Sequence, residues 1–172
     1  SGVILSQLLR GIGKGVAGKK TLNNTEIGKA FQFGILYAYR SVSKPVEGTI
    51  LTVARGMAKG AYNAVRGNVS LEKVLLEAIR SGKEELARTP ELLPALKAAG
   101  VVDAGGQGLI VFFEGCLAGL RGQDCEVLPV TPRAKVQIQK GEPLDLEYPY
   151  CTEFIVKDAD VDKQTVSKAL EG

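Results

Sequence analysis

Three short stretches of the sequence combine glycine with a hydroxyl or carboxyl group where a helix is expected to begin: residues 1–7, 44–52 and 99–109. The third carries four glycines and Asp103 directly before an apolar run. Glycine lets a ligand approach the main chain closely. The first turn of a helix offers unpaired N–H groups and the positive end of the helix dipole, which suit an anion such as a phosphate. The stretches therefore predict an anion-binding site built largely from backbone.

Each stretch also has a purely structural interpretation. Ser1 and Asp103 are both good N-cap residues, and a run of glycines is common in tight connections between helices. Gly48 and Thr49 could belong to a helix that Pro45 initiates, in which glycine costs up to about 1 kcal/mol relative to alanine. Both interpretations stay open for any single stretch. The occurrence of three stretches of similar character favours the functional one.

Composition narrows the classes of function. The 172 residues are 45% hydrophobic and 24% charged, which is ordinary for one globular domain, or one domain and part of another. The net charge of +3 is spread among scattered basic and acidic residues, which argues against nucleic-acid binding. Because the chain has no histidine, histidine catalysis and histidine metal ligation within it are excluded. Three cysteines without a C-x-x-C pair favour reduced thiols and a cytoplasmic location.

No apolar run approaches the roughly 20 residues that a membrane-spanning helix needs. The residues at Ser1 also lack the features of a signal peptide. We therefore expect no transmembrane segment, and we expect the chain to be a segment of a longer cytoplasmic protein.

The spacing of apolar residues predicts an all-α domain over residues 1–122. Helices are expected to begin near residues 3, 24, 46, 70, 91 and 104, the last ending near Leu120. Thr89, Pro90 and Glu91 have the character of a hydroxyl cap, a first-turn proline and an acid at the start of a new helix, which Gly100 then ends. Beyond this domain we expect a linker over residues 123–149, with strand-like alternation at 134–139. Residues 150–172 are expected to begin an α+β domain, with a strand at 151–156 and a short helix at 162–170.

In order along the chain, the motifs SGVILSQ, KPVEGTILTVAR and LKAAGVVDAGGQGL resemble those of the dihydroxyacetone kinase L-type (DAK2) domain. They are most similar to those of the bacterial fatty acid kinase A component, and YPYCTEFIV resembles the start of its middle domain. The resemblance spans essentially the whole chain. It implies an antiparallel helical barrel or bundle that holds ADP or ATP at one end.

The nucleotide contacts that the resemblance implies fall on seven residues: Ser1, Gly2, Thr49, Ile50, Asp103, Ala104 and Gly105. The first pair matches an element that contacts the phosphates, the second pair an element that lines the site, and the last three a turn that closes over the nucleotide. Ala104 stands where the family has proline, so a looser turn is expected. No catalytic residue and no metal ligand of this chain is implied, because the family's Mg²⁺-binding aspartates precede the first motif and are expected upstream of Ser1.

The resemblance thus implies the ATP/ADP-binding domain of a fatty-acid-kinase-like phosphotransferase in phospholipid metabolism. With Mg²⁺, such an enzyme forms an acyl phosphate from a fatty acid that a fatty-acid-binding partner protein presents. Without the upstream metal ligands, the chain itself is expected to be inactive. Two alternatives stay open: the ADP-binding subunit of a dihydroxyacetone kinase, which the continuation past Gly122 disfavours, and a non-catalytic helical nucleotide-binding or scaffold module. A homodimer is left open.

Overall fold

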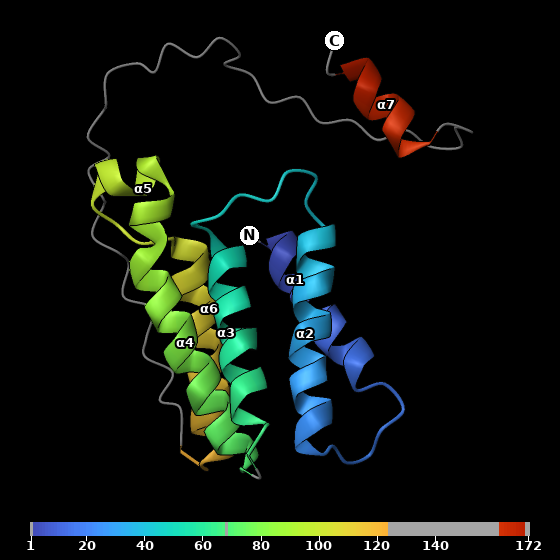
Figure 1. The fold of residues 1–172 in the computed structure, drawn as a ribbon, viewed down its shortest axis with the longest axis vertical. Coiled ribbons are helices and arrows are strands. Elements are labelled where there is room, and N and C mark those ends of the chain that lie inside the picture. Colours follow the sequence, from blue (N-terminus) through green and yellow to red (C-terminus); the bar gives the residue numbers. More distant parts are fainter. Residues whose placement is uncertain (1, 68, 124–161, 171–172) are drawn as a thin grey trace. The chain divides into compact units, whose positions relative to one another are not determined.

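A computed structural model of the chain describes residues 2–67, 69–123 and 162–170 (Figure 1). The chain divides into two compact units, Ser1–Leu128 and Pro129–Gly172. The described part of the first unit forms six helices: α1 (Gly2–Gly15), α2 (Asn24–Arg40), α3 (Ile50–Ala64), α4 (Leu71–Leu92), α5 (Pro94–Ala99) and α6 (Ala104–Leu120). No strand occurs within the described residues, and the all-α class expected for this part of the chain is confirmed.

The long helices of the first unit alternate in direction. Helices α1, α3 and α6 begin at the end of the bundle where α2 and α4 finish (Figure 1). Helix α2 packs against α1 and α3, and both α4 and α6 pack against α3. This up-and-down arrangement brings the three glycine-bearing motifs, which precede or open α1, α3 and α6, to one end.

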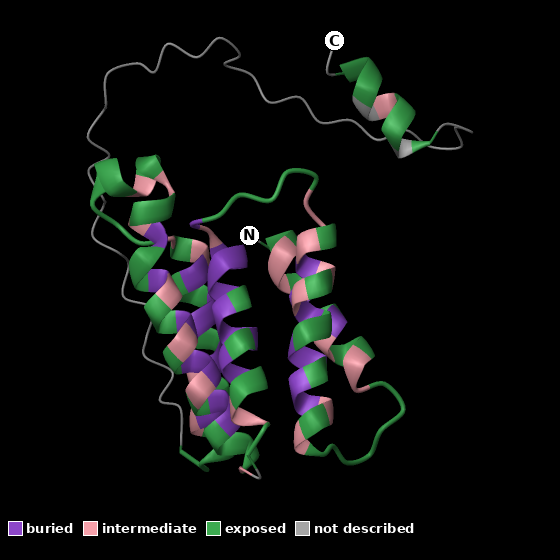
Figure 2. Ribbon diagram, viewed as in Figure 1, coloured by how far each residue is buried: buried purple, intermediate pink, exposed green. Residues whose placement is uncertain are grey.

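Helix α3 is the centre of the core (Figure 2). Ten of its residues are buried: Ile50, Leu51, Thr52, Val53, Ala54, Gly56, Met57, Ala58, Gly60 and Ala61. Their side chains meet apolar side chains of the other helices, including Leu86 of α4 and Leu109 and Ile110 of α6. Because the first residue of α3 is already buried, the position of its N-terminus is fixed by the core.

Two helix boundaries differ from the prediction. The helix expected from residue 46 begins only at Ile50, because Gly48 has a φ of 81° and Thr49 is extended. The prediction that a new helix begins at Thr89 and Pro90 was wrong, because α4 continues through both residues to Leu92. The short α5 that follows ends, as predicted, at Gly100, whose φ is 64°.

The described helix of the second unit, α7 (Lys163–Leu170), confirms the short helix expected near the end of the chain. The Asp162 carboxylate accepts the N–H groups of Gln164 and Thr165 at 2.8 and 3.1 Å, which fixes where the helix begins. The expected strands at residues 134–139 and 151–156 lie outside the described residues, and so does almost all of the expected linker. Across the described ranges, no helix combines the length and hydropathy needed to cross a bilayer.

Candidate anion-binding site

The first of the three motifs opens α1. Gly2 is the first residue of that helix and is exposed, whereas Ser1 lies outside the described residues. Of the two residues predicted here to contact the nucleotide, the structure therefore describes only Gly2. Its helix begins at the same end of the bundle as α3 and α6 (Figure 1).

The second motif forms the turn before α3. Thr49 is the N-cap: its hydroxyl donates to the Val46 carbonyl at 2.8 Å and accepts the Leu51 N–H at 3.4 Å. The next two N–H groups of the helix donate to the Thr49 carbonyl. The Ile50 N–H, by contrast, has no acceptor among the described residues. Since the Ile50 side chain is only 4% exposed and lies in the core, this residue can meet a nucleotide only through its backbone.

The third motif forms the turn before α6. Asp103 is the N-cap, and its carboxylate accepts the Gly106 N–H at 2.7 Å, while its carbonyl accepts the Gln107 N–H at 2.9 Å. The N–H groups of Ala104 and Gly105 have no acceptor in the described part of the chain. Gly105 has helical backbone within α6. In both turns the capping residue orders the helix start, and the residues after it keep free donors.

The two turns meet at Thr89 of α4. Its hydroxyl accepts the Asp103 N–H at 3.1 Å, and its carbonyl lies 3.1 Å from the position that a Cβ on Gly48 would take. Thr89 is fully buried. The sequence analysis missed this role because it assigned Thr89 to a helix cap. One signal was available: a threonine directly precedes a proline in a stretch whose apolar spacing also suits a single helix that continues through both residues.

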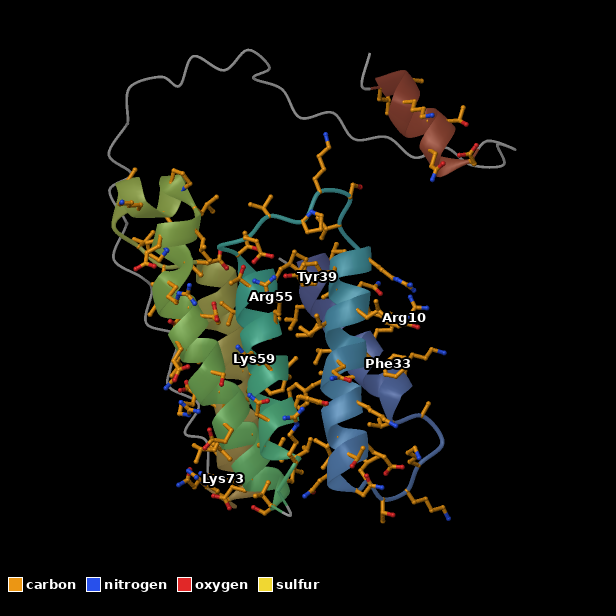
Figure 3. The ribbon with its side chains drawn as sticks, in the orientation of Figure 1. Arg10, Phe33, Tyr39, Arg55, Lys59 and Lys73 are labelled. Carbon is orange, nitrogen blue, oxygen red and sulfur yellow. The ribbon has the colours of Figure 1, made fainter. Side chains whose placement is uncertain are left out.

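A charged cluster supports the turn before α3. The two Glu47 carboxylate oxygens each accept one N–H group of Arg55 at 2.8 Å, and the same carboxylate accepts the hydroxyls of Thr52 and Tyr39. Tyr39 and Arg55 come from α2 and α3 and lie toward the same end of the bundle (Figure 3). The sequence does not predict that these partners meet Glu47, because no local spacing rule joins residues across a turn.

The electrostatics of this cluster favour an ionised Glu47. Burial by itself would raise the pKa of the Glu47 carboxyl, but the hydrogen bond from Thr52 and the positive charge of Arg55 outweigh it, so the pKa lies below its ordinary value. Burial raises the pKa of the Tyr39 hydroxyl, and the Glu47 carboxylate acts in the same direction, against the effect of Arg55. Because both Glu47 oxygens are occupied by Arg55, this carboxylate is poorly placed to bind a metal ion.

The donor set fits phosphate oxygens better than it fits Mg²⁺. Free N–H groups at the positive ends of two helix dipoles suit an anion. Magnesium needs several oxygen ligands, and no group of three or more metal-ligating side chains occurs among the described residues. Asp103 is occupied by Gly106 through one of its oxygens. The donors in these two turns therefore have the chemistry that suits a phosphate more than the chemistry that suits Mg²⁺.

An apolar groove of about 650 Å³ lies at the other end of the bundle. It is lined by the last turns of α1, the first turns of α2 and α4, and the C-terminal half of α6, with Phe31 and Phe113 in its wall. None of the seven predicted nucleotide-binding residues lines it. The groove is therefore separate from the end of the bundle at which the two turns lie.

Comparisons with known proteins agree with the motifs. A family model described as the DAK2 domain matches residues 1–118. Protein YloV of Bacillus subtilis is 40% identical over 168 residues, which cover 91% of this chain and 30% of YloV. Uncharacterized proteins of Staphylococcus epidermidis and Staphylococcus haemolyticus are each 40% identical over 164 residues, with the same coverage. The chain thus spans about 30% of the length of these curated relatives. With most of its length matched by the family model, the chain belongs to the DAK2 domain family, a kinase-related family whose motifs occupy the starts of α1, α3 and α6.

Proposed function

We propose that the first turns of α3 and α6 bind the phosphates of ATP or ADP. The observation that carries this proposal is the set of three N–H groups, on Ile50, Ala104 and Gly105, that have no acceptor within the described ranges and lie in two turns that Thr89 joins. Membership of a kinase-related family makes a nucleotide the best-supported anion. Gly2, at the start of α1, would be the third contribution to the same end, together with Ser1, which precedes it in the sequence.

The residues of the site divide into donors and supports. Ile50, Ala104 and Gly105 donate backbone N–H groups to phosphate oxygens, while Thr49 and Asp103 hold the turns through their caps. Such donors neutralise charge and orient the phosphates, which is most of what a protein contributes to phosphoryl transfer. When bound, Mg²⁺ would add further charge neutralisation at the phosphates, and its ligands are proposed to lie upstream of Ser1.

For the whole protein we propose a cytoplasmic fatty-acid-kinase-like enzyme, which forms an acyl phosphate from a fatty acid presented by a separate binding protein. The length of the relatives supports this over an isolated dihydroxyacetone kinase subunit. They are about three times as long as the part that this chain matches. The family resemblance implies, by contrast, that the dihydroxyacetone kinase subunit consists of the helical domain alone.

Nuclear magnetic resonance of the ¹⁵N-labelled chain tests the phosphate site directly. Titration with ADP in the absence of Mg²⁺ should shift the amide signals of Ile50, Ala104 and Gly105 more than those of the opposite end of the bundle. Adenosine, which lacks phosphates, is the matched control and should leave the three signals in place. Equal shifts with adenosine, or no shift with ADP, would contradict the proposal and favour a scaffold module.

Calorimetry tests where the metal ligands lie. Titrated with ATP, the 172-residue chain should show no micromolar, Mg²⁺-dependent binding and no phosphoryl transfer, because backbone N–H groups cannot hold divalent cations against water. A micromolar isotherm that requires Mg²⁺ would place the ligands within this chain, and the assignment to an upstream segment would then be wrong.

A further inference from the structure

Helix α4 contains a proline in its last turn, and Thr89 compensates for it. Pro90 has no N–H group, so the Leu86 carbonyl, four residues earlier, lacks the donor that a helix normally provides. The Thr89 hydroxyl donates to that carbonyl at 2.7 Å. The hydroxyl proton therefore has a fixed direction, and the hydroxyl oxygen is left as an acceptor.

The acceptor side of the same hydroxyl receives the turn before α6. The Asp103 N–H donates to it at 3.1 Å, and the Asp103 carboxylate then accepts the Gly106 N–H at 2.7 Å. Thr89 is 0% exposed, so water does not compete for its hydroxyl. A continuous series of hydrogen bonds thus runs from the Leu86 carbonyl through Thr89 to the first turn of α6.

We infer that Thr89 is a positioning residue for phosphate binding by the N–H groups of Ala104 and Gly105. The inference rests on the proposed function. Donors stabilise an anion most when they are held in place before it arrives. Without the Thr89 hydroxyl, the Asp103 N–H must turn toward water to find an acceptor, and the two donors that follow it move with it.

The first experiment compares Thr89→Val with Thr89→Ser. Valine keeps the shape and removes the hydroxyl, whereas serine keeps the hydroxyl. We expect the ADP dissociation constant, measured from the amide shifts of Gly105, to rise about tenfold in the valine variant, the usual scale for losing one buried hydrogen bond. The serine variant should stay within about threefold of the wild type.

A second pair of variants separates positioning from helix repair. Pro90→Ala restores an N–H donor for the Leu86 carbonyl, so Thr89→Val in that background leaves only the Asp103 N–H without a partner. Compared with Pro90→Ala alone, the double variant should bind ADP about tenfold more weakly. Its Asp103 and Gly106 amides should also exchange hydrogen faster, while those in the middle of α3 keep their protection.

The outcomes distinguish this inference from the function beneath it. If Pro90→Ala and the double variant bind ADP equally well, Thr89 only repairs the helix and the positioning role is overturned, although the phosphate site stands. If the wild-type chain shows no phosphate-dependent ADP shifts, the proposed function fails and this inference fails with it. The positioning role and the proposed function are both supported if the double variant binds ADP more weakly than Pro90→Ala alone and Thr89→Ser binds it nearly as well as the wild type.

Discussion

The turns before α3 and α6 are held by the same kind of hydrogen bond, but the group that accepts it donates its own proton to a different partner in each turn. A fully buried threonine hydroxyl accepts one N–H of each turn: Thr52 accepts that of Gly48 at 2.9 Å, and Thr89 accepts that of Asp103 at 3.1 Å. The Thr52 hydroxyl then donates to the Glu47 carboxylate, whereas the Thr89 hydroxyl donates to a backbone carbonyl. The Thr52 hydroxyl is therefore tied to a charged cluster, and the Thr89 hydroxyl to neutral, buried backbone groups.

This difference decides what each turn responds to. The Arg55 and Glu47 side chains are 54% and 44% exposed, so their attraction is screened by water and salt. The hydrogen bonds of Thr89 lie away from solvent, where a missing partner costs the most. We therefore expect the contact of Thr52 with Glu47 to respond to pH and ionic strength, and the contact of Thr89 with Asp103 to respond mainly to changes in shape and hydroxyl content.

The largest effect is expected where the turn before α3 contacts the end of α4. Gly48 has a φ of 81°, and a Cβ on it would lie 2.9 Å from the Leu93 Cβ and 3.1 Å from the Thr89 carbonyl oxygen. Gly48→Ala combines backbone strain with overlap, so the free energy of unfolding should fall by about 2–4 kcal/mol in urea denaturation.

The matched control for that variant is Gly18→Ala. Gly18 has nearly the same φ, 76°, but nothing lies within 4 Å of its would-be Cβ. Strain alone should cost about 1 kcal/mol there. If the two variants lose equal stability, the close contact between Gly48 and the end of α4 contributes nothing, and Thr89 does not link the two turns through it.

The next effect concerns the approach of α6 to α3. A Cβ on Gly106 would lie 2.6 Å from Val53 Cγ2, and Val53 is fully buried and cannot move aside easily. Gly106→Ala should lower the free energy of unfolding by about 1–2 kcal/mol, since overlap exceeds the gain in helix propensity.

Gly108→Ala, in the same helix, is the opposite case because nothing lies within 4 Å of its would-be Cβ. Thermal unfolding should show it slightly stabilised, by up to about 1 kcal/mol. Destabilisation of both variants to the same extent would mean that α6 tolerates no added side chain, whatever its surroundings.

A smaller effect is expected from the two caps. The Asp103 carboxylate meets the Gly106 N–H at 2.7 Å, whereas the Thr49 hydroxyl meets the Leu51 N–H at the longer distance of 3.4 Å. Asp103→Ala should therefore cost about 1 kcal/mol of unfolding free energy, and Thr49→Ala less. Asp103→Asn keeps an acceptor and should stay close to the wild type. Urea denaturation checks the order, and a larger loss at Thr49 would contradict it.

Much of this arrangement could be predicted from the sequence, because apolar periodicity places most of the helices and their alternation sends three motifs to one end. The position of Asp103 before a helix start also followed from its residue type, whereas Thr49 was expected inside a helix from residue 46 and is the N-cap of α3 instead. The interpretation of Thr89 failed for a physical reason. A threonine before a proline suits a helix start, but it equally suits a helix that continues, since the hydroxyl can bond the carbonyl that proline leaves without a donor.

The sequence also could not predict which residues of the site would offer a side chain and which would offer only a backbone N–H group. Ile50 was expected to line the nucleotide site, and the sequence did not show that its side chain would lie in the core. That placement depends on which face of α3 meets the other helices. The pairing of Glu47 with Arg55 depends on the sharp turn at Gly48. Both facts are set by tertiary packing, which local spacing does not contain.

The smallest effect, and the most specific to the α3 turn, is its response to pH. Because the pKa of Glu47 is lowered in the folded chain, the ionised carboxylate contributes stability at neutral pH, above its unfolded pKa. That contribution is lost as the pH falls through the lowered folded value. At pH 7, Glu47→Gln should lower the unfolding free energy by less than about 1 kcal/mol, since the Arg55 pair is largely exposed.

The informative quantity is the difference in unfolding free energy between wild type and Glu47→Gln, measured by urea denaturation from pH 7 down to about pH 3. The other carboxylates are present in both proteins, so the pH dependence that they contribute to stability cancels in this difference. The difference should shrink as the pH falls below the ordinary range of a glutamate and should also shrink in molar salt. For Thr89→Val, the corresponding difference should be nearly insensitive to salt, because both hydrogen bonds of the Thr89 hydroxyl are made with uncharged backbone groups. A salt-independent Glu47 difference would show that its hydrogen bonds from Thr52 and Tyr39, and not the charge of Arg55, hold the turn before α3.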